Sequence, residues 1–174
     1  PVLFSGTLFL NITFNNNDVT EERVLEIMSQ IGAQSFIDKQ PNGIHELVED
    51  MGRNFSVGER QLIAFARVMV YDPEILILDE ATANIDTETE IMIQKALNVI
   101  SQNRTTFIIA HRLSTVKHAD QLIVLNKGNI VERGTHEELV EKDGLYAKMY
   151  QSQMREEYTH EVLKNSKKKL ALNI

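Results

Sequence analysis

The hydrophobic positions of the chain recur with two periods, one typical of helices and one typical of buried strands. Apolar residues return at helical spacing in residues 20–31, 56–71 and 87–102. Residues 75–78 are instead four consecutive large aliphatic residues, and residues 106–110 form a second β-rich run. A short aliphatic run favours a strand that is buried on both faces of a parallel sheet. Helices that alternate with such strands predict an α/β fold.

Polar residues indicate where several of these elements begin. Thr20 is a good N-cap for the first helix. Thr87 with Glu90, and Thr135 with Glu138, have the spacing of capping boxes, so we expect a helix to begin at each pair.

Turn residues shape the remaining stretches. Residues 121–125 and 130–133 flank Asn126-Lys127-Gly128-Asn129, which predicts a β-hairpin. We expect residues 34–47 to be irregular, and residues 144–164 are compatible with a helix.

Composition narrows the class of protein. The chain has 174 residues, of which 43% are hydrophobic, and this is enough for one core. Its longest apolar runs are far shorter than the ~20 residues of a membrane-spanning helix, and no signal peptide is visible. Without cysteine there is neither a disulfide framework nor a thiolate metal site, which fits a cytoplasmic location. The net charge of −7 argues against nucleic acid as a partner.

Two acidic residues, Asp79 and Glu80, follow the aliphatic run directly. The carboxyl ends of parallel strands are where α/β folds bind ligands. A carboxylate there can hold nucleotide-bound Mg²⁺, and a second one can polarise the water that attacks a γ-phosphate. The same pattern also fits a strand that meets a solvated loop.

Three segments together resemble the nucleotide-binding domain of ATP-binding cassette (ABC) transporters. Residues 55–59, Phe-Ser-Val-Gly-Glu, are similar to the signature motif LSGGQ, and residues 75–80 are similar to Walker B with its catalytic glutamate. Residues 83–86 resemble the D-loop, and His111 in Ala-His-Arg-Leu-Ser resembles the switch histidine. The segments Leu3-Phe4-Ser5-Gly6-Thr7 and Gly134-Thr135-His136-Glu137-Glu138-Leu139 resemble the exporter type in particular.

No G-x-x-x-x-G-K-[ST] motif, the Walker A phosphate loop, occurs in the chain. In the family, the Q-loop glutamine precedes the proline that Pro1 matches. We therefore expect the carboxyl-terminal portion of a P-loop-NTPase-like ABC cassette, with part of the helical subdomain and the Walker B half of the parallel sheet. Residues 1–153 would form this partial domain, and residues 154–174 a helical, basic tail.

The resemblance implies roles for three residues of one ATP site. Asp79 would position Mg²⁺, partly through water, Glu80 would polarise the attacking water, and His111 would contact the γ-phosphate. A histidine at a strand end can also be an ordinary polar residue.

The resemblance also implies contacts with the partner domain. Ser56 and Gly58 would bind the γ-phosphate of an ATP held by the opposite domain, and Asp86 would lie at the domain interface. Ser56 and Asp86 can equally be N-caps of the helices that follow them.

The signature departs from the family pattern at two positions. Val57 stands where the family has glycine, the residue that allows close backbone approach to a ligand. Glu59 places a carboxylate near a phosphate site. We therefore expect an asymmetric pair with an unlike partner domain, although harmless variation is the alternative. Asp50-Met51-Gly52 also differs from the usual Glu-Arg-Gly of the exporter X-loop.

The expected function is ATP binding and hydrolysis that power export across a membrane. ATP and Mg²⁺ would be the cofactors, and a second nucleotide-binding domain and the transmembrane domains the partners. The domain would lie on the cytoplasmic face of the cell membrane, and the isolated chain would be inactive. The alternatives are the ATPase head of a DNA-repair or chromosome-maintenance protein and a noncatalytic fragment.

Overall fold

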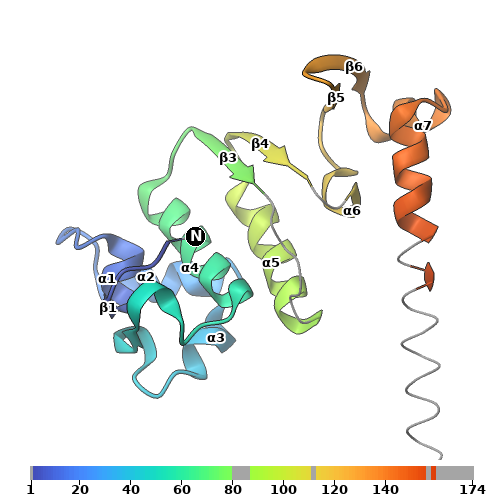
Figure 1. Cartoon of the computed structure of the whole chain (residues 1–174). Helices are drawn as coiled ribbons and strands as arrows, with labels where there is room; N and C mark the ends of the chain where they lie inside the picture. The colour runs from blue at the N-terminus through green and yellow to red at the C-terminus, as the bar shows by residue number, and fades with distance from the viewer. Residues whose placement is uncertain (1, 80–86, 111–112, 156–157, 160–174) are drawn as a thin grey trace, which may run out of the picture. The chain divides into compact units, whose positions relative to one another are not determined.

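The computed structural model describes residues 2–79, 87–110, 113–155 and 158–159. The chain divides into two compact units, residues 1–109 and 110–174 (Figure 1).

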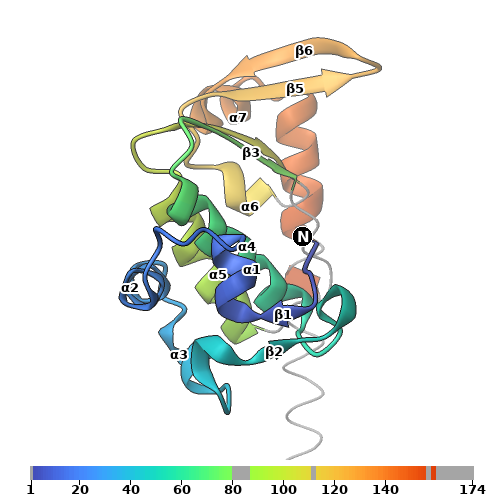
Figure 2. The ribbon, with the colours of Figure 1, turned by 90° about the vertical axis from the view of Figure 1, so that its left-hand side faces the viewer.

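Unit 1 begins with short elements that surround the longest helix. They are β1 (Gly6–Thr7), α1 (Leu8–Thr13), α2 (Glu21–Gln30), α3 (Gln34–Asp38), η1 (Gly43–His45), β2 (Leu47–Val48) and η2 (Asp50–Gly52), and the helix is α4 (Val57–Tyr71). Helix α4 packs against α1 and α2 (Figure 2) and also against α5 (Thr87–Ile100). The core is therefore built around α4, whose buried face carries Leu62, Ile63, Phe65 and Ala66.

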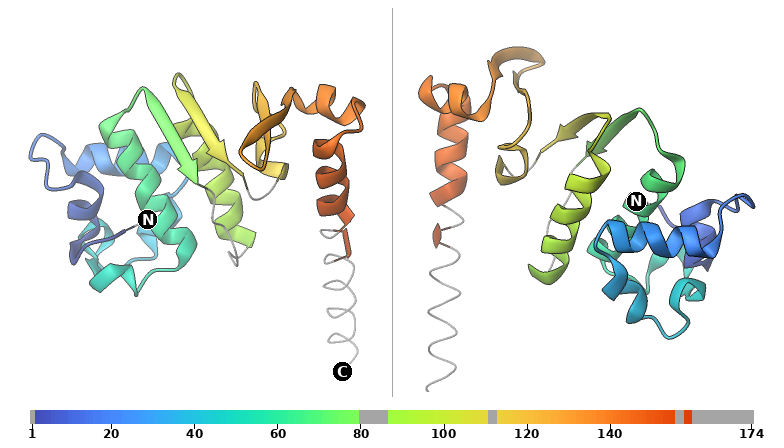
Figure 3. Two further views of the ribbon diagram at one scale, coloured as in Figure 1. Left: turned by 45° about the horizontal axis from the view of Figure 1, so that its top comes forward. Right: turned by 180° about the vertical axis from the view of Figure 1, so that it is seen from behind.

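A parallel strand pair follows α4. Strands β3 (Ile75–Asp79) and β4 (Thr105–Ile109) are joined through α5, with Ile75 opposite Thr105 and Asp79 opposite Ile109. The predicted parallel pairing and βαβ order are confirmed. Helices α4 and α5 lie along one side of this pair (Figure 3).

The expectation that the first strand is buried on both faces is wrong for the described residues. Leu76 is only 6% exposed and belongs to the core, whereas Ile75 and Ile77 are 61% and 67% exposed. Side chains alternate along a strand, so the face that packs on α4 and α5 takes only every second residue. No described element of unit 1 covers the face of Ile75 and Ile77.

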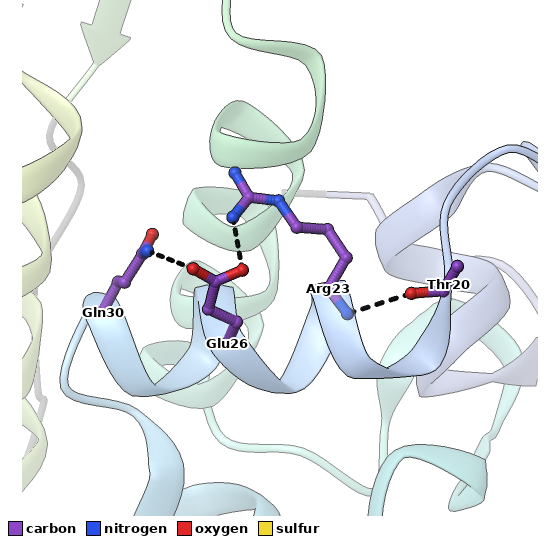
Figure 4. A network of polar contacts seen from close by, with 4 residues as sticks. All are labelled: Thr20, Arg23, Glu26 and Gln30. Carbon is purple, nitrogen blue, oxygen red and sulfur yellow. Dashed lines mark hydrogen bonds and ion pairs between the residues drawn. The ribbon is translucent and has the colours of Figure 1, made fainter.

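Helix α2 confirms the predicted helix of residues 20–31. The Thr20 hydroxyl accepts the amide N–H of Arg23 at 3.2 Å and so caps the helix. Arg23 pairs with Glu26 at 2.7 Å, and Gln30 donates to the same carboxylate at 3.1 Å (Figure 4). These exposed i,i+3 and i,i+4 contacts support the solvent face.

Residues 34–47 are more ordered than expected. Helix α3 and the turn η1 form there, although Ala33 provides no side-chain cap for α3. Phe36 and Ile37 are buried, and the Phe36 ring packs edge-on against Phe55 at 5.8 Å. Tertiary burial therefore stabilises a helix that its own sequence marks weakly.

Unit 2 contains the predicted hairpin. Its elements are α6 (Leu113–Val116), β5 (Leu122–Asn126), β6 (Asn129–Gly134) and α7 (His136–Glu141), and residues 145–155 are also helical. Figure 2 shows β5 and β6 side by side. Lys127 and Gly128 have positive φ angles of 48° and 79°, as a two-residue type I′ hairpin turn requires at both of its central positions. Both hydrogen bonds of the Thr135/Glu138 capping box are present.

No helix among the described residues is long and apolar enough to span a lipid bilayer.

Candidate functional site

Asp79 is the last residue of β3, at the carboxyl end of the parallel pair. It lies on the same strand face as Ile75 and Ile77, because side chains two residues apart point to one side. The sequence pattern predicted this position, and the role of Asp79 in Mg²⁺ binding stays a prediction. Glu80, Asp86 and His111 lie outside the described residues.

Ser56 and Glu59 form a complete capping box at the start of α4. The Ser56 hydroxyl accepts the Glu59 amide N–H at 3.2 Å, and the Glu59 carboxylate accepts the Ser56 amide N–H at 2.8 Å. The predicted N-cap is therefore present. The carboxylate that differs from the family pattern is folded back onto the first turn of its own helix, where the helix dipole favours negative charge. Gly58 is buried, and Val57 is 40% exposed.

The turn before α4 is held by Arg60. Its Nη1 donates to the carbonyl oxygens of Phe55 at 2.6 Å and of Gly52 at 3.3 Å. Gly52 has φ +70°, and a Cβ atom there would lie 2.7 Å from Leu3 Cδ1. Met51, where the family usually has arginine, also has positive φ (57°) and is 62% exposed. The position of Ser56 thus depends on a tight, glycine-requiring turn.

A second arginine of α4, Arg67, binds the first residues of the chain. Its Nε donates to the Asn11 carbonyl at 2.7 Å, its Nη1 to the Val2 carbonyl at 2.8 Å and its Nη2 to Asn11 Oδ1 at 3.2 Å. Partial burial lowers the pKa of Arg67 from its ordinary value. Sequence reasoning missed both arginines. For Arg67 the available signal was a charged residue inside the apolar stretch of residues 62–70, whereas Arg60 lies before that stretch.

Among the described residues, the Asp79 carboxylate is compatible with a magnesium ion that is bound to a nucleotide. Mg²⁺ takes one or two carboxylates and completes its shell with water and phosphate oxygens, so a single carboxylate at a strand end suits it. Among the described residues there is no cluster of three or more His, Cys, Asp or Glu side chains that could hold a metal ion by itself. The donor set therefore fits a nucleotide-borne Mg²⁺ better than a caged structural ion.

Comparisons with known proteins agree with this arrangement. Residues 2–83 match the family described as ABC transporter. The chain is 54% identical over 159 residues to a Bacillus subtilis (strain 168) protein named probable multidrug resistance ABC transporter ATP-binding/permease protein YheH. The matched region covers 91% of this chain and 24% of that protein. It is 45% identical over 159 residues to the ATP-dependent lipid A-core flippase of Xylella fastidiosa (strain 9a5c), with 91% and 27% covered.

A solved structure is also similar, that of a bacterial Atm1-family ABC exporter with ATP bound. The TM-score is 0.77 at 38% identity, and the match covers 87% of this chain and 27% of that one. The chain thus spans about a quarter of the length of these proteins. It has the ABC cassette fold, with a parallel sheet in an α/β arrangement. The comparisons support an ABC exporter nucleotide-binding domain and do not favour the DNA-repair alternative.

Proposed function

We propose that this chain, which has the ABC cassette fold, forms the carboxyl-terminal part of a nucleotide-binding domain that hydrolyses ATP to power an exporter. One observation carries the proposal: Asp79 ends a parallel strand in the same unit in which a Ser56-capped helix begins. The similarity to multidrug and lipid exporters supports export across a membrane, with the domain on the cytoplasmic face.

Three residues would act on one ATP. Asp79 would position the Mg²⁺ that accompanies the nucleotide, Glu80 would polarise the attacking water, and His111 would contact the γ-phosphate. Magnesium, when bound, neutralises charge on the phosphate oxygens. Phosphoryl transfer needs little more than positioning and electrostatic stabilisation, which is what these polar side chains supply.

The test is the Glu80→Gln variant of the full-length transporter. The amide keeps the shape of the side chain but loses its charge, so we expect ATP binding to persist while turnover falls by about 10²-fold or more. His111→Ala should act in the same direction. Near wild-type turnover of either variant, measured as phosphate release, would remove that residue from the catalytic assignment.

A surface of unit 1 suits docking of the transmembrane domains. Phe4, Phe14 and Tyr71 are 56%, 48% and 50% exposed, and their rings are in contact, with centroids 6.2 Å apart for Phe4 and Phe14 and 5.9 Å apart for Phe14 and Tyr71. We name these three residues the aromatic patch. Contiguous exposed aromatic side chains mark protein interfaces. The transmembrane domains of the same transporter are the proposed occupant.

The second nucleotide-binding domain is the other proposed partner, and we propose that it is unlike this one. Ser56 and Gly58 would face the ATP held by that partner, and Asp86 would lie between the domains. In this chain the Ser56 hydroxyl accepts the Glu59 amide N–H of its own helix, and the Glu59 carboxylate accepts the Ser56 amide N–H. Val57 stands at the position where the family has glycine. These features support a weakened phosphate site on this chain, which an intact signature on the partner would offset at the second site.

The pairing is tested by purifying the full-length transporter without a partner. We expect a homodimer to hydrolyse ATP slowly and an unlike partner with a Leu-Ser-Gly-Gly-Gln signature to raise the rate. Robust activity from a homodimer with two equivalent sites would contradict the asymmetric arrangement.

A further inference from the structure

Two side chains on one face of helix α4 hydrogen-bond to the segment of residues 2–14. Arg67 and Tyr71 are four residues apart, so both project from the same face. The Tyr71 hydroxyl donates to the Thr13 carbonyl at 2.9 Å, while Arg67 donates to the carbonyls of Val2 and Asn11. The contacts join residues 56 to 65 positions apart in the chain.

The segment is itself folded around Asn11, which is only 2% exposed. The Asn11 side chain donates to the carbonyls of Phe4 at 2.8 Å and Thr7 at 3.1 Å, and its Oδ1 accepts the Phe4 amide N–H at 2.9 Å. The same oxygen accepts from Arg67 Nη2. Arg67 therefore adds a second hydrogen bond to the oxygen of a buried amide whose nitrogen and oxygen both already have backbone partners in the segment.

The guanidinium of Arg67 also lies over the Phe14 ring, 4.5 Å from its centroid. Arginine can donate in several fixed directions while its flat face stacks on an aromatic ring, and lysine cannot do both. The described partners of Arg67 are carbonyl oxygens, an amide oxygen and a ring, and none of them is a carboxylate. This set of contacts suits a backbone clamp better than a charge pair.

We infer that Arg67 is a positioning residue that fixes the aromatic patch to the helix beginning at Ser56. Two members of the patch, Phe4 and Phe14, belong to the clamped segment, and the third, Tyr71, belongs to α4 itself. A movement of a partner docked on the patch would then displace α4, and with it Ser56 at the start of this helix. Arg67 lies 11 residues after Ser56 on the same helix. The functional part of this inference rests on the proposed function, because it requires that the patch docks the transmembrane domains.

The clamp is tested on this chain by hydrogen–deuterium exchange with mass spectrometry. We expect Arg67→Met to raise the amide exchange rate of residues 8–14 at least about tenfold, with α2 and α5 unchanged. Arg23→Met is the matched control, because among the described residues the Arg23 side chain pairs with the exposed Glu26 of its own helix and with no distant segment. Exchange in residues 8–14 within twofold of wild type would overturn the clamp.

Arg67→Lys keeps the charge and is measured alongside, in case the methionine variant fails to fold. It should raise exchange in residues 8–14 at least about threefold, because one ammonium cannot reach three acceptors and stack as well. An unchanged rate in this variant would likewise overturn the clamp.

The positioning role is tested in the full-length transporter by steady-state ATP hydrolysis. The Arg67→Lys variant should lower kcat at least about fivefold and leave the KM for ATP within twofold, since Arg67 is expected to touch no nucleotide. If kcat stays near wild type while Glu80→Gln is inactive, the proposed function stands and the positioning role is overturned. A rise in KM together with loss of folded protein would also overturn it, since that pattern is purely structural. If Glu80→Gln itself stays active, the proposed function fails, and the exchange data still decide the clamp.

Discussion

At the scale of single residues, polar side chains accept hydrogen bonds from backbone N–H groups that have no partner within their own helix or turn. Ser56 and Thr135 each accept an amide N–H of their own helix, and Glu59 and Glu138 return the bond to the cap residue. Glu132 does the same across a longer distance in unit 2, where it accepts the amide N–H groups of residues 145 and 146. Helix starts in both units therefore depend on side-chain oxygens.

We expect Ser56→Ala to lower the free energy of unfolding by about 1 kcal/mol, because an N-cap acceptor is lost. Glu59→Gln keeps an oxygen acceptor for the Ser56 amide and is the matched control, with a much smaller effect. Thermal denaturation followed by circular dichroism measures both variants. Equal losses for the two would contradict the assignment of Ser56 as the stronger cap.

Glu132 should make the helix of residues 145–155 sensitive to acid. Hydrogen bonds lower the pKa of Glu132 below its ordinary value of 4.5; the bond from the Tyr146 amide has the larger effect and the bond from the Leu145 amide the smaller. The positive charges of nearby Lys142 and Lys148 lower this pKa further. A lowered pKa in the folded state means that the stabilisation is complete above the unfolded pKa. It is lost as the pH falls through the folded pKa.

Melting curves recorded from neutral pH downward test this expectation. Glu132→Gln should lower the melting temperature at neutral pH and weaken its decline below about pH 4.5. Glu141→Gln, an exposed carboxylate of α7, is the control and should leave both unchanged. An acid transition of undiminished size in the Glu132→Gln variant would assign the effect to other groups.

At the scale of elements, β3 presents two unlike faces. Leu76 and Leu78 face the core with Ile108 of β4, while Ile75 and Ile77 stand beside exposed Phe107 and Ile109. Parallel sheets are normally covered on both faces. The apolar face that ends at Asp79 is thus left uncovered by the described elements of unit 1.

Matched truncations on the two faces measure this difference. Leu76→Ala should lower the free energy of unfolding by about 2–5 kcal/mol, since it leaves a cavity in the core. Ile77→Ala, on the neighbouring position of the same strand, should change it by less than about 0.5 kcal/mol in this chain. Urea denaturation provides the measurement, and a comparable loss for Ile77→Ala would show that its face is covered as well.

At the scale of the whole molecule, the proposed ATP site needs more than the described residues offer. The sequence contains no Walker A motif, whose backbone amides and lysine hold the phosphates. The described part contributes one carboxylate at a strand end and one capped helix start. Positioning of the nucleotide, on which phosphoryl transfer depends, would therefore be incomplete in this chain alone.

We accordingly expect this chain by itself neither to bind ATP tightly nor to hydrolyse it. Isothermal titration calorimetry with Mg-ATP should detect no micromolar binding, and phosphate release should not exceed that of a Glu80→Gln control. Micromolar affinity, or turnover above the control, would contradict the expectation.

Local signals in the sequence were sufficient for most elements of this fold. Helices α2, α4 and α5 follow from apolar spacing and from capping residues such as Thr20 and Ser56, because these act within one or two turns. The β5–β6 hairpin follows from its turn residues, and the position of Asp79 follows from the aliphatic run before it. The two acids after that run also indicated a role for Glu80, and motif resemblance alone supplied the expected role of His111.

Only the tertiary structure decided which surfaces these elements share. Helix α3 forms without a cap because Phe36 and Ile37 are buried, and β3 has one exposed face because α4 and α5 pack on the other. The Arg67 clamp joins residues up to 65 positions apart, and the Glu59 carboxylate turns back onto Ser56 rather than outward. Burial and long-range hydrogen bonding depend on how the elements pack, and the spacing of residues along the chain does not encode that packing directly.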